Sequence, residues 1–363
     1  EKPYDKNVNN EINNLSYEKF DIRGNKYLIK AKKGILDSEY PNIIYMNKVE
    51  ASLVYLNNEK LTIYSKEAIF NKENFKTTFS KNIKLVYKKQ VVESDILEFL
   101  IDKNIAIFKD NVKYNISLGS GNMSNNDSGT KNIALGYNTL AANTTGSNNA
   151  GVGYRALYSN TSGASNNAQG VNALYSNTTG SYNTGVGQAA LRTNTTGNYN
   201  TAVGQAALFN ATTASNNTAM GAQSLFANTT GRENSSVGFQ SLYNNTTGSF
   251  NNAQGAYALN KNTTGIKNTA VGQAAMRANT TGNQNVAIGQ NTMRASNSSF
   301  NTGIGAESLY NATSGSKNTT LGYRTLYTNT TGSLNTVVGF KAGFRNNNSG
   351  NTFLGANAGL ENT

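Results

Sequence analysis

Side chains that carry out covalent chemistry are scarce in this sequence. It contains no Cys and no His, which excludes thiol nucleophiles, disulfides, His-dependent triads and the usual zinc sites. After Ser117 the carboxylates are isolated from one another, so no pair for general acid–base catalysis can be placed; they are Asp127, Glu233, Glu307 and Glu361. We therefore expect a protein that is not an enzyme, with no catalytic residues, no metal and no cofactor.

One regularly spaced set of aromatic and arginine side chains could recognise a ligand. Such side chains could stack on sugar rings, or they could pack against another copy of the chain. We expect the packing role, because a coil with one Val and one Leu gains only about 1.5–3 kcal/mol per large side chain, whereas ordering its backbone costs several times more. The residues are Tyr158, Tyr175, Arg192, Phe209, Phe226, Tyr243, Arg277, Arg294, Tyr310, Tyr327 and Phe344.

This row belongs to a repeat that runs from Leu118 to the end of the sequence. The segment Asn200–Leu208, NTAVGQAAL, is its cleanest copy. Aligning the copies on their shared glycine gives a step of 17 residues, with two steps of 16, from Gly289 to Gly305 and from Gly339 to Gly355. A fixed period this short predicts a parallel β-solenoid of about 14 coils, in which each coil must stack on its neighbours to bury its apolar side chains.

The composition changes near Ser117, which divides the chain. We predict a linker at 1–16, an antiparallel β-domain at 17–117 and the solenoid at 118–363. The first part is rich in Lys, Glu, Ile and Tyr, and the second is rich in Asn, Thr, Gly and Ala. Both prolines, Pro3 and Pro41, precede the repeats, so every coil can donate its backbone hydrogen bonds.

Two positions are apolar in nearly every coil: the residue before the aligned glycine and the fourth residue after it. Gln169 and Gln254 are the exceptions at the first position. We predict that both rows form the solenoid core, which would contain Val152, Leu157, Val186, Leu191, Val203, Leu208, Val237, Leu242, Val271, Ile288, Ile304 and Leu309.

The fourth residue before the glycine is Asn in every coil. An Asn in identical register can hydrogen-bond the Asn of the next coil, so we predict a structural ladder. Its members are Asn132, Asn149, Asn166, Asn183, Asn200, Asn217, Asn234, Asn251, Asn268, Asn285, Asn301, Asn318, Asn335 and Asn351.

A second corner carries Asn-Thr-Thr-Gly, as at Asn177–Gly180. Its Asn and Gly are typical of a turn. The triplet also matches the N-glycosylation sequon, but the turn explains it fully. Stacked Thr residues suggest ice binding too, although two adjacent Thr at a corner cannot form a flat two-column array.

Period-two alternation in the first part predicts antiparallel strands with one buried face. Tyr27, Ile29 and Ala31 share one face, as do Ile83, Leu85 and Tyr87 in a later run. Seven or more such strands in this length indicate a sandwich or jelly roll.

The segment from about Leu15 to Tyr114 resembles the periplasmic β-jelly-roll domain of LptC-type lipopolysaccharide-export proteins. The resemblance lies in a strand ending in Ala and Gly, an Asn-x-Val step, a Ser-x-x-Ala step and a Thr-Phe-Ser-x-x-Ile return (Ala31, Gly34, Asn47, Val49, Ser65, Ala68, Thr78, Phe79, Ser80 and Ile83). It implies an open apolar groove for acyl chains; a closed core is the alternative. The groove would be lined by Ile29, Leu53, Ile63, Leu85, Ile96, Phe99 and Ile107.

The repeats resemble the heads of trimeric autotransporter adhesins and, more closely, the β-solenoid repeats of phage tail fibres. The adhesin phrase is close to Asn285–Gly289, and the tail-fibre phrase to Leu174–Val186. The resemblance covers about two thirds of the chain and implies a β-roll in a homotrimeric fibre.

The net charge of +12 is spread thinly. After Ser117 there are 12 basic and 4 acidic residues, which leaves 20 and 16 before it. A nucleic-acid site would need a dense basic stripe, so we expect no nucleic-acid partner. No run of about 18 apolar residues exists, so we expect no membrane span in this chain.

We therefore expect an exported fibre or adhesin-type structural protein at a cell surface, at a virion surface or in the periplasm of a Gram-negative-type system. Its solenoid would be an oligomeric shaft and the N-terminal domain a base, cap or docking domain. A cell-surface glycan or lipopolysaccharide would be its ligand. The alternative is a lipopolysaccharide- or lipid-binding bridge extended by a solenoid, and a third hypothesis is a fusion that retains neither function.

Overall fold

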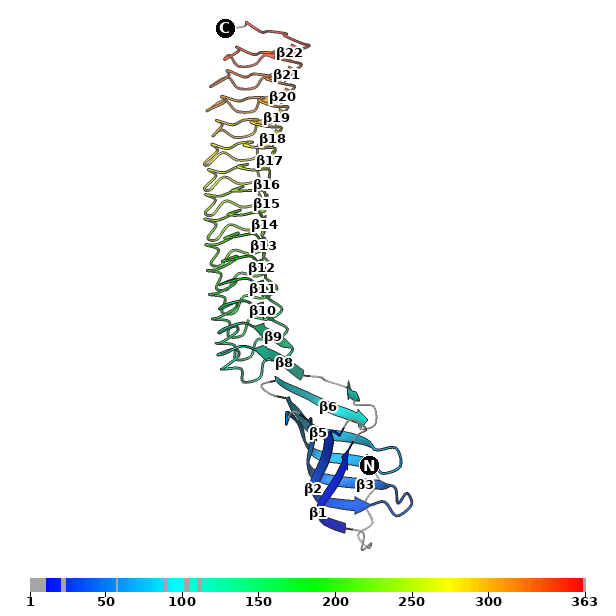
Figure 1. Cartoon of the computed structure of the whole chain (residues 1–363). Helices are drawn as coiled ribbons and strands as arrows, with labels where there is room; N and C mark the ends of the chain where they lie inside the picture. Colours follow the sequence, from blue (N-terminus) through cyan, green and yellow to red (C-terminus); the bar gives the residue numbers. More distant parts are fainter. Residues whose placement is uncertain are drawn as a thin grey trace. The chain divides into compact units, whose positions relative to one another are not determined.

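The structure is a computed structural model of the 363-residue chain. It describes residues 11–20, 24–56, 58–87, 90–100, 105–109 and 113–361, and between residues 87 and 116 the only side chain it describes is that of Leu97. The chain divides into two compact units, residues 1–118 with 130–132 and residues 119–129 with 133–363. The regular elements of the described residues are all strands, which confirms the predicted all-β fold (Figure 1).

The first unit is an antiparallel sheet in which each strand pairs with its sequence neighbour. The order β1-β2-β3-β4-β5-β6 is continuous, and β6 also pairs with β7 through one end and with β8 through the other. The strands are β1 (Glu11–Phe20), β2 (Lys26–Leu36), β3 (Ile43–Val54), β4 (Lys60–Asn71), β5 (Lys76–Tyr87), β6 (Gln90–Leu100), β7 (Ile105–Lys109) and β8 (Lys113–Leu118).

The burial pattern of this sheet shifts by one residue along a single line across its strands. In β2, Ala31 and Gly34 are buried while both residues between them are exposed, although regular alternation would expose only one. The same double exposure occurs in β3 at Asn47 and Lys48. Lys48 has a φ of 52°, a left-handed conformation that is costly for a residue with a Cβ. The sequence predicted the alternation on one side of this line, as at Tyr27, Ile29 and Ala31, but not the shift.

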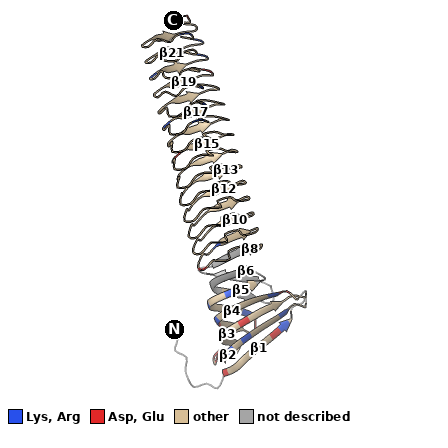
Figure 2. Ribbon diagram, turned by 90° about the vertical axis from the view of Figure 1, so that its left-hand side faces the viewer, with Lys and Arg blue, Asp and Glu red and all other residues tan. Residues whose placement is uncertain are grey.

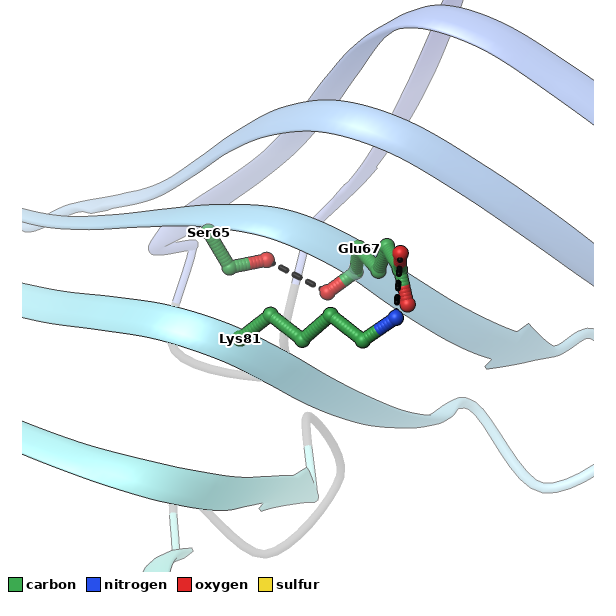
Figure 3. A network of polar contacts seen from close by, with 3 residues as sticks. All are labelled: Ser65, Glu67 and Lys81. Carbon is green, nitrogen blue, oxygen red and sulfur yellow. Dashed lines mark hydrogen bonds and ion pairs between the residues drawn. The ribbon is translucent and has the colours of Figure 1, made fainter.

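A β-bulge marks the same line in β5. The pairing of β5 with β4 jumps between Tyr64 and Glu67, and Lys81 has a φ of 63°. Ser65 Oγ donates a hydrogen bond of 2.5 Å to the carbonyl oxygen of Glu67, whose carboxylate lies 2.9 Å from Lys81 Nζ (Figure 3). Because bulges bend a strand, we expect the sheet to bend along this line.

The core of the first unit is a continuous apolar cluster. Phe79 and Leu97 are completely buried, and Tyr27, Ile63 and Phe70 are at most 2% exposed. Burying each of these large side chains contributes about 1.5–3 kcal/mol. The cluster therefore forms the hydrophobic core that stabilises the first unit.

The second unit is a parallel β-solenoid of about 14 coils with one short strand per coil (Figure 1). Neighbouring strands pair in register at an offset of 17 residues, as at Thr184 and Thr201, with the two predicted offsets of 16. The strands are β9 (Asn132–Leu135), β10 (Ala150–Val152), β11 (Asn167–Gln169), β12 (Thr184–Val186), β13 (Thr201–Val203), β14 (Thr218–Met220), β15 (Ser235–Val237), β16 (Asn252–Gln254), β17 (Thr269–Val271), β18 (Val286–Ile288), β19 (Thr302–Ile304), β20 (Thr319–Leu321), β21 (Thr336–Val338) and β22 (Thr352–Leu354).

The interior of the coils differs from the prediction in one row. The fourth residue after the glycine is buried as predicted, at Leu157, Leu191, Leu208, Leu242 and Leu309. The residue before the glycine instead points outward: Val203 is 36% exposed and Val237 39%. The prediction of a core position is therefore wrong for Val152, Val186, Val203, Val237, Val271, Ile288 and Ile304, which are exposed or half-buried.

Strand alternation gives the reason. Asn200 is buried, so Thr201 points out, Ala202 points in and Val203 points out. The interior position of each strand is thus the second residue before the glycine, which is completely buried in Ala168, Ala202, Ala219 and Ala287. Most side chains at this position are small, although Thr320 and Val337 are also completely buried there.

Candidate functional site

The structure places the predicted Asn row inside the solenoid, where it forms a ladder. Asn149 Oδ1 accepts hydrogen bonds from the backbone N–H (3.0 Å) and the side-chain amide (3.1 Å) of Asn166. The amide of Asn166 also donates to the carbonyl of Gly180 at 2.8 Å. Members from Asn132 to Asn335 are at most 2% exposed. These amides hold the coils together and cannot touch a ligand.

A second Asn ladder lies at the Asn-Thr-Thr-Gly corner. Asn160 donates from Nδ2 to Asn143 Oδ1 at 2.8 Å and to the carbonyl of Gly163 at 3.0 Å. The turn pattern of the sequence predicted only a turn role for this Asn, although its 17-residue spacing also indicates a ladder. Asn177 in this row is completely buried, so its sequon serves the turn and the ladder, and its side chain does not reach the surface.

The second ladder is interrupted where the next coil lacks the amide. Asn194 Oδ1 and Asn279 Oδ1 are buried without a hydrogen-bond partner. The positions 17 residues later are Ala211 and Ser296. Each interruption therefore leaves a buried acceptor unsatisfied, which costs about 1–3 kcal/mol.

The interruption at Ala211 is coupled to a second substitution. At the corner glycine of an intact coil, Gly180, an added Cβ would lie 2.4 Å from Asn177 Oδ1. The broken coil has Ala214 at the equivalent position. Asn and Gly are therefore replaced together, because the Cβ of Ala would occupy the space of the amide.

We expect Ala312→Asn to stabilise the solenoid by about 1 kcal/mol. Ala312 is completely buried and its coil retains Gly315, so the amide would have space. The new side chain would donate to the Gly315 carbonyl, as Asn329 does to Gly332 at 3.0 Å, and would accept from Asn329. Chemical denaturation followed by circular dichroism measures the effect.

Position 211 supplies the control for this prediction. Ala211→Asn alone is expected to give no gain, because Ala214 retains its Cβ. The double substitution Ala211→Asn with Ala214→Gly is expected to stabilise by joining Asn194 to Asn228. Equal effects of the single and double substitutions would contradict the steric coupling.

The structure brings the predicted aromatic and arginine row together as a stack along one edge. The rings of Tyr158 and Tyr175 are 5.1 Å apart and inclined by 5°, and Tyr327 and Phe344 are 5.1 Å apart at 1°. The Arg192 guanidinium lies 5.7 Å from the ring of Tyr175. Because neighbours in the stack cover the ring faces that a sugar would need, this row contributes mainly to stability.

One arginine near this stack is held by a carboxylate. Arg324 Nε donates to Glu307 Oε2 at 2.6 Å, and its guanidinium lies 5.0 Å from the Tyr323 ring. The hydrogen bond from this guanidinium to Glu307 raises the pKa of Arg324 above its ordinary value. The pair links adjacent coils, and it is a surface contact.

The most distinctive surface of the solenoid is free of charge. We define the uncharged face as three positions in each coil from β9 to β22: the two outward residues of the strand and the residue after the glycine. None of these positions holds Lys, Arg, Asp or Glu in any coil, although 16 charged residues follow Ser117. In Figure 2 the strands from β10 to β21 are drawn tan.

This face also exposes large apolar side chains along its length. Val152, Met220, Ile288 and Leu321 before the glycine are 39%, 45%, 39% and 48% exposed. The residue after the glycine adds further exposed apolar side chains. Those that are at least 37% exposed are Tyr137, Tyr154, Val171, Phe239, Tyr323 and Phe340. Charge depletion around exposed aliphatic and aromatic residues is the compositional signal of a protein interface.

The predicted lipid groove is packed in the part of the first unit that the structure describes. Ile29, Leu53, Ile63 and Leu85 are buried together in the core. The cavity lined by three of them has a volume of about 10 Å³, which is the size of one water molecule. The side chains of Ile96, Phe99 and Ile107 lie outside the described residues.

The described residues contain no helix that is long and apolar enough to span a membrane. Within the same residues, no group of three or more acidic side chains is placed to hold a metal ion. No protein-family model matches the chain, and no curated protein is similar to it.

Proposed function

We propose that this chain is a non-enzymatic structural fibre protein that self-associates through the uncharged face of its solenoid. One observation carries the proposal: over about 14 coils, three adjacent positions per coil exclude every charged residue while exposing Val, Ile, Met, Tyr and Phe. Monomeric soluble proteins rarely expose an apolar stripe of this extent. A second copy of the chain would cover it.

The register of the coils supports a self-complementary interface. Each strand repeats the same outward positions at the strand spacing of about 4.8 Å, so the face extends roughly 65 Å. Two or more identical faces would match coil by coil. We propose a homotrimer, in agreement with the resemblance to adhesin heads and tail-fibre repeats, with the solenoid as shaft and the first unit as base, cap or docking domain.

An exported location at a cell or virion surface, or in the periplasm, fits this role. We assign the oligomer contact to the uncharged face and no longer to the aromatic and arginine row. A glycan that approached this row would meet only the edges of its rings. The lipid-bridge alternative would require the packed core of the first unit to open, because its cavity holds about one water.

The mass of the full-length protein in solution tests the proposal. Sedimentation equilibrium is expected to give three times the chain mass of 38.8 kDa. The double substitution Val237→Lys with Ile288→Lys places charges in the centre of the face and is expected to weaken association at least 100-fold, since buried unpaired charges are costly.

Thr196→Lys with Thr247→Lys provides a matched control. Both residues are exposed at the Asn-Thr-Thr-Gly corner, away from the uncharged face, and the added charge is the same. This variant is expected to keep the trimer mass. A monomeric wild-type protein, or equal dissociation of both variants, would contradict the proposal.

A further inference from the structure

The outer face of the first unit carries a row of lysines at the line where its sheet bends. Register places Lys32 opposite Lys48, between the pairs Ala31–Val49 and Lys33–Asn47, and Lys48 opposite Lys66. All three side chains are exposed and none forms an ion pair within the described residues. We name Lys32, Lys48 and Lys66 the lysine ridge.

Several lysines on the same sheet are paired with carboxylates, whereas the three lysines of the ridge are not, in the part of the chain that the structure describes. Lys26 contacts Glu18, Lys33 contacts Glu11 and Lys60 contacts Glu50, at 2.8, 2.8 and 3.4 Å. The carboxylate closest in sequence to the ridge, Glu67, is engaged by Lys81. The charge of the ridge is therefore not neutralised by these acidic residues.

The ridge costs stability to the folded sheet. Like charges directly opposite each other on adjacent strands are destabilising. Lys48 also adopts a φ of 52°, where Gly or Asn would be less strained. The ridge therefore lowers the stability of the sheet through both charge repulsion and backbone strain. This points to an external anion whose binding offsets the loss of stability.

The surroundings of the ridge indicate which kind of anion. Ile35 and Ile69 point outward from the same face and are 37% and 41% exposed, with Tyr45 between them in register. They lie three residues along the strands from the ridge, about 10 Å away. Lysines beside exposed aliphatic side chains suit the headgroup region of a bilayer, whereas a nucleic acid would leave the isoleucines unused.

We propose that the outer face of the N-terminal sheet binds the surface of an anionic lipid bilayer, with the lysine ridge against the phosphate groups and Ile35 and Ile69 at the acyl boundary. The ridge is a row across three neighbouring strands that lie about 4.8 Å apart, so it extends over a greater length than one small anion. A planar array of phosphates can meet all three. This proposal does not depend on the solenoid or on its oligomeric state.

Vesicle co-sedimentation of the full-length protein tests the proposal. Binding to phosphatidylcholine vesicles that contain phosphatidylglycerol is expected to exceed binding to pure phosphatidylcholine and to fall with salt. Each lysine near an anionic surface contributes roughly fivefold in affinity. The triple substitution Lys32→Gln, Lys48→Gln, Lys66→Gln is therefore expected to weaken binding about 100-fold, and the same positions changed to Arg should retain it.

A charge-matched control separates the ridge from net charge. The triple substitution Lys26→Gln, Lys33→Gln, Lys60→Gln removes the same number of charges from paired lysines and is expected to lose several-fold less affinity. Equal losses in the two triple variants, or equal binding of the wild type to both kinds of vesicle, would overturn the proposal. Tighter binding of a short DNA duplex than of anionic vesicles would also overturn it.

Discussion

Gly204→Ala is expected to destabilise the solenoid by about 4 kcal/mol, because two penalties act at one atom. Gly204 has a φ of +134°, a conformation essentially restricted to glycine. A Cβ at this position would lie 2.6 Å from the carbonyl carbon and oxygen of Gly221 in the next coil. Both contacts are with backbone, which cannot rotate away. Denaturant unfolding monitored by circular dichroism measures the loss.

Ala206→Gly is the opposite substitution two residues later and serves as the control. Ala206 also has a positive φ, 53°, but lies in the ordinary left-handed region. Replacing it with Gly should relieve strain and stabilise the coil by up to about 1 kcal/mol. If Gly204→Ala and Ala206→Gly changed the free energy of unfolding by amounts of similar size, the close approach of neighbouring coils would not be the reason that position 204 requires glycine.

The period of the repeat determined most of what could be predicted about the solenoid. A 17-residue step with two 16-residue steps predicted the number and offset of the coils, and the structure pairs Val286 with Thr302 and Thr336 with Thr352 at the shorter offsets. A period locates equivalent residues, but it does not say which of them point inward.

The error in the core row shows what was missing. The Asn row and the Val row are three positions apart, so they have opposite parity on one strand and cannot both be interior. Taking Asn200 as a ladder residue would have required Val203 to point out. Hydrophobicity alone favoured Val203 over Ala202, but Ala202 is the residue that is completely buried, together with Leu208.

The candidate surfaces could be predicted only in part, for the same reason. The uncharged face can be recognised only once it is known which side of each strand points outward. The sequence pattern alone favoured partner contact through the aromatic and arginine row instead. The lysine ridge depends on the register of β2, β3 and β4, since Lys32, Lys48 and Lys66 are far apart in sequence. No single-strand pattern brings them together.

Asn200→Ala is expected to cost about 3 kcal/mol, since the buried groups that it leaves behind lose their partners. Asn200 Oδ1 accepts from the backbone N–H and the side-chain amide of Asn217, at 3.1 and 3.2 Å. Its Nδ2 donates to Asn183 Oδ1 at 3.2 Å and to the Ala214 carbonyl at 2.7 Å. Thr201→Ala, at the outward neighbour, should change the free energy of unfolding by less than about 0.5 kcal/mol.

Asn200→Asp distinguishes the ladder from simple packing, because it keeps the shape of the side chain and removes its donors. The introduced carboxyl would face the oxygens of Asn183 and Ala214, and burial would raise its pKa above that in the unfolded chain. The folded state then binds more protons than the unfolded state, so stability relative to wild type should fall as the pH rises above about 4. Unfolding at pH 4 and pH 7 measures this difference. A loss independent of pH and equal to that of Thr201→Asp would show that the amide donors do not hold the coils together.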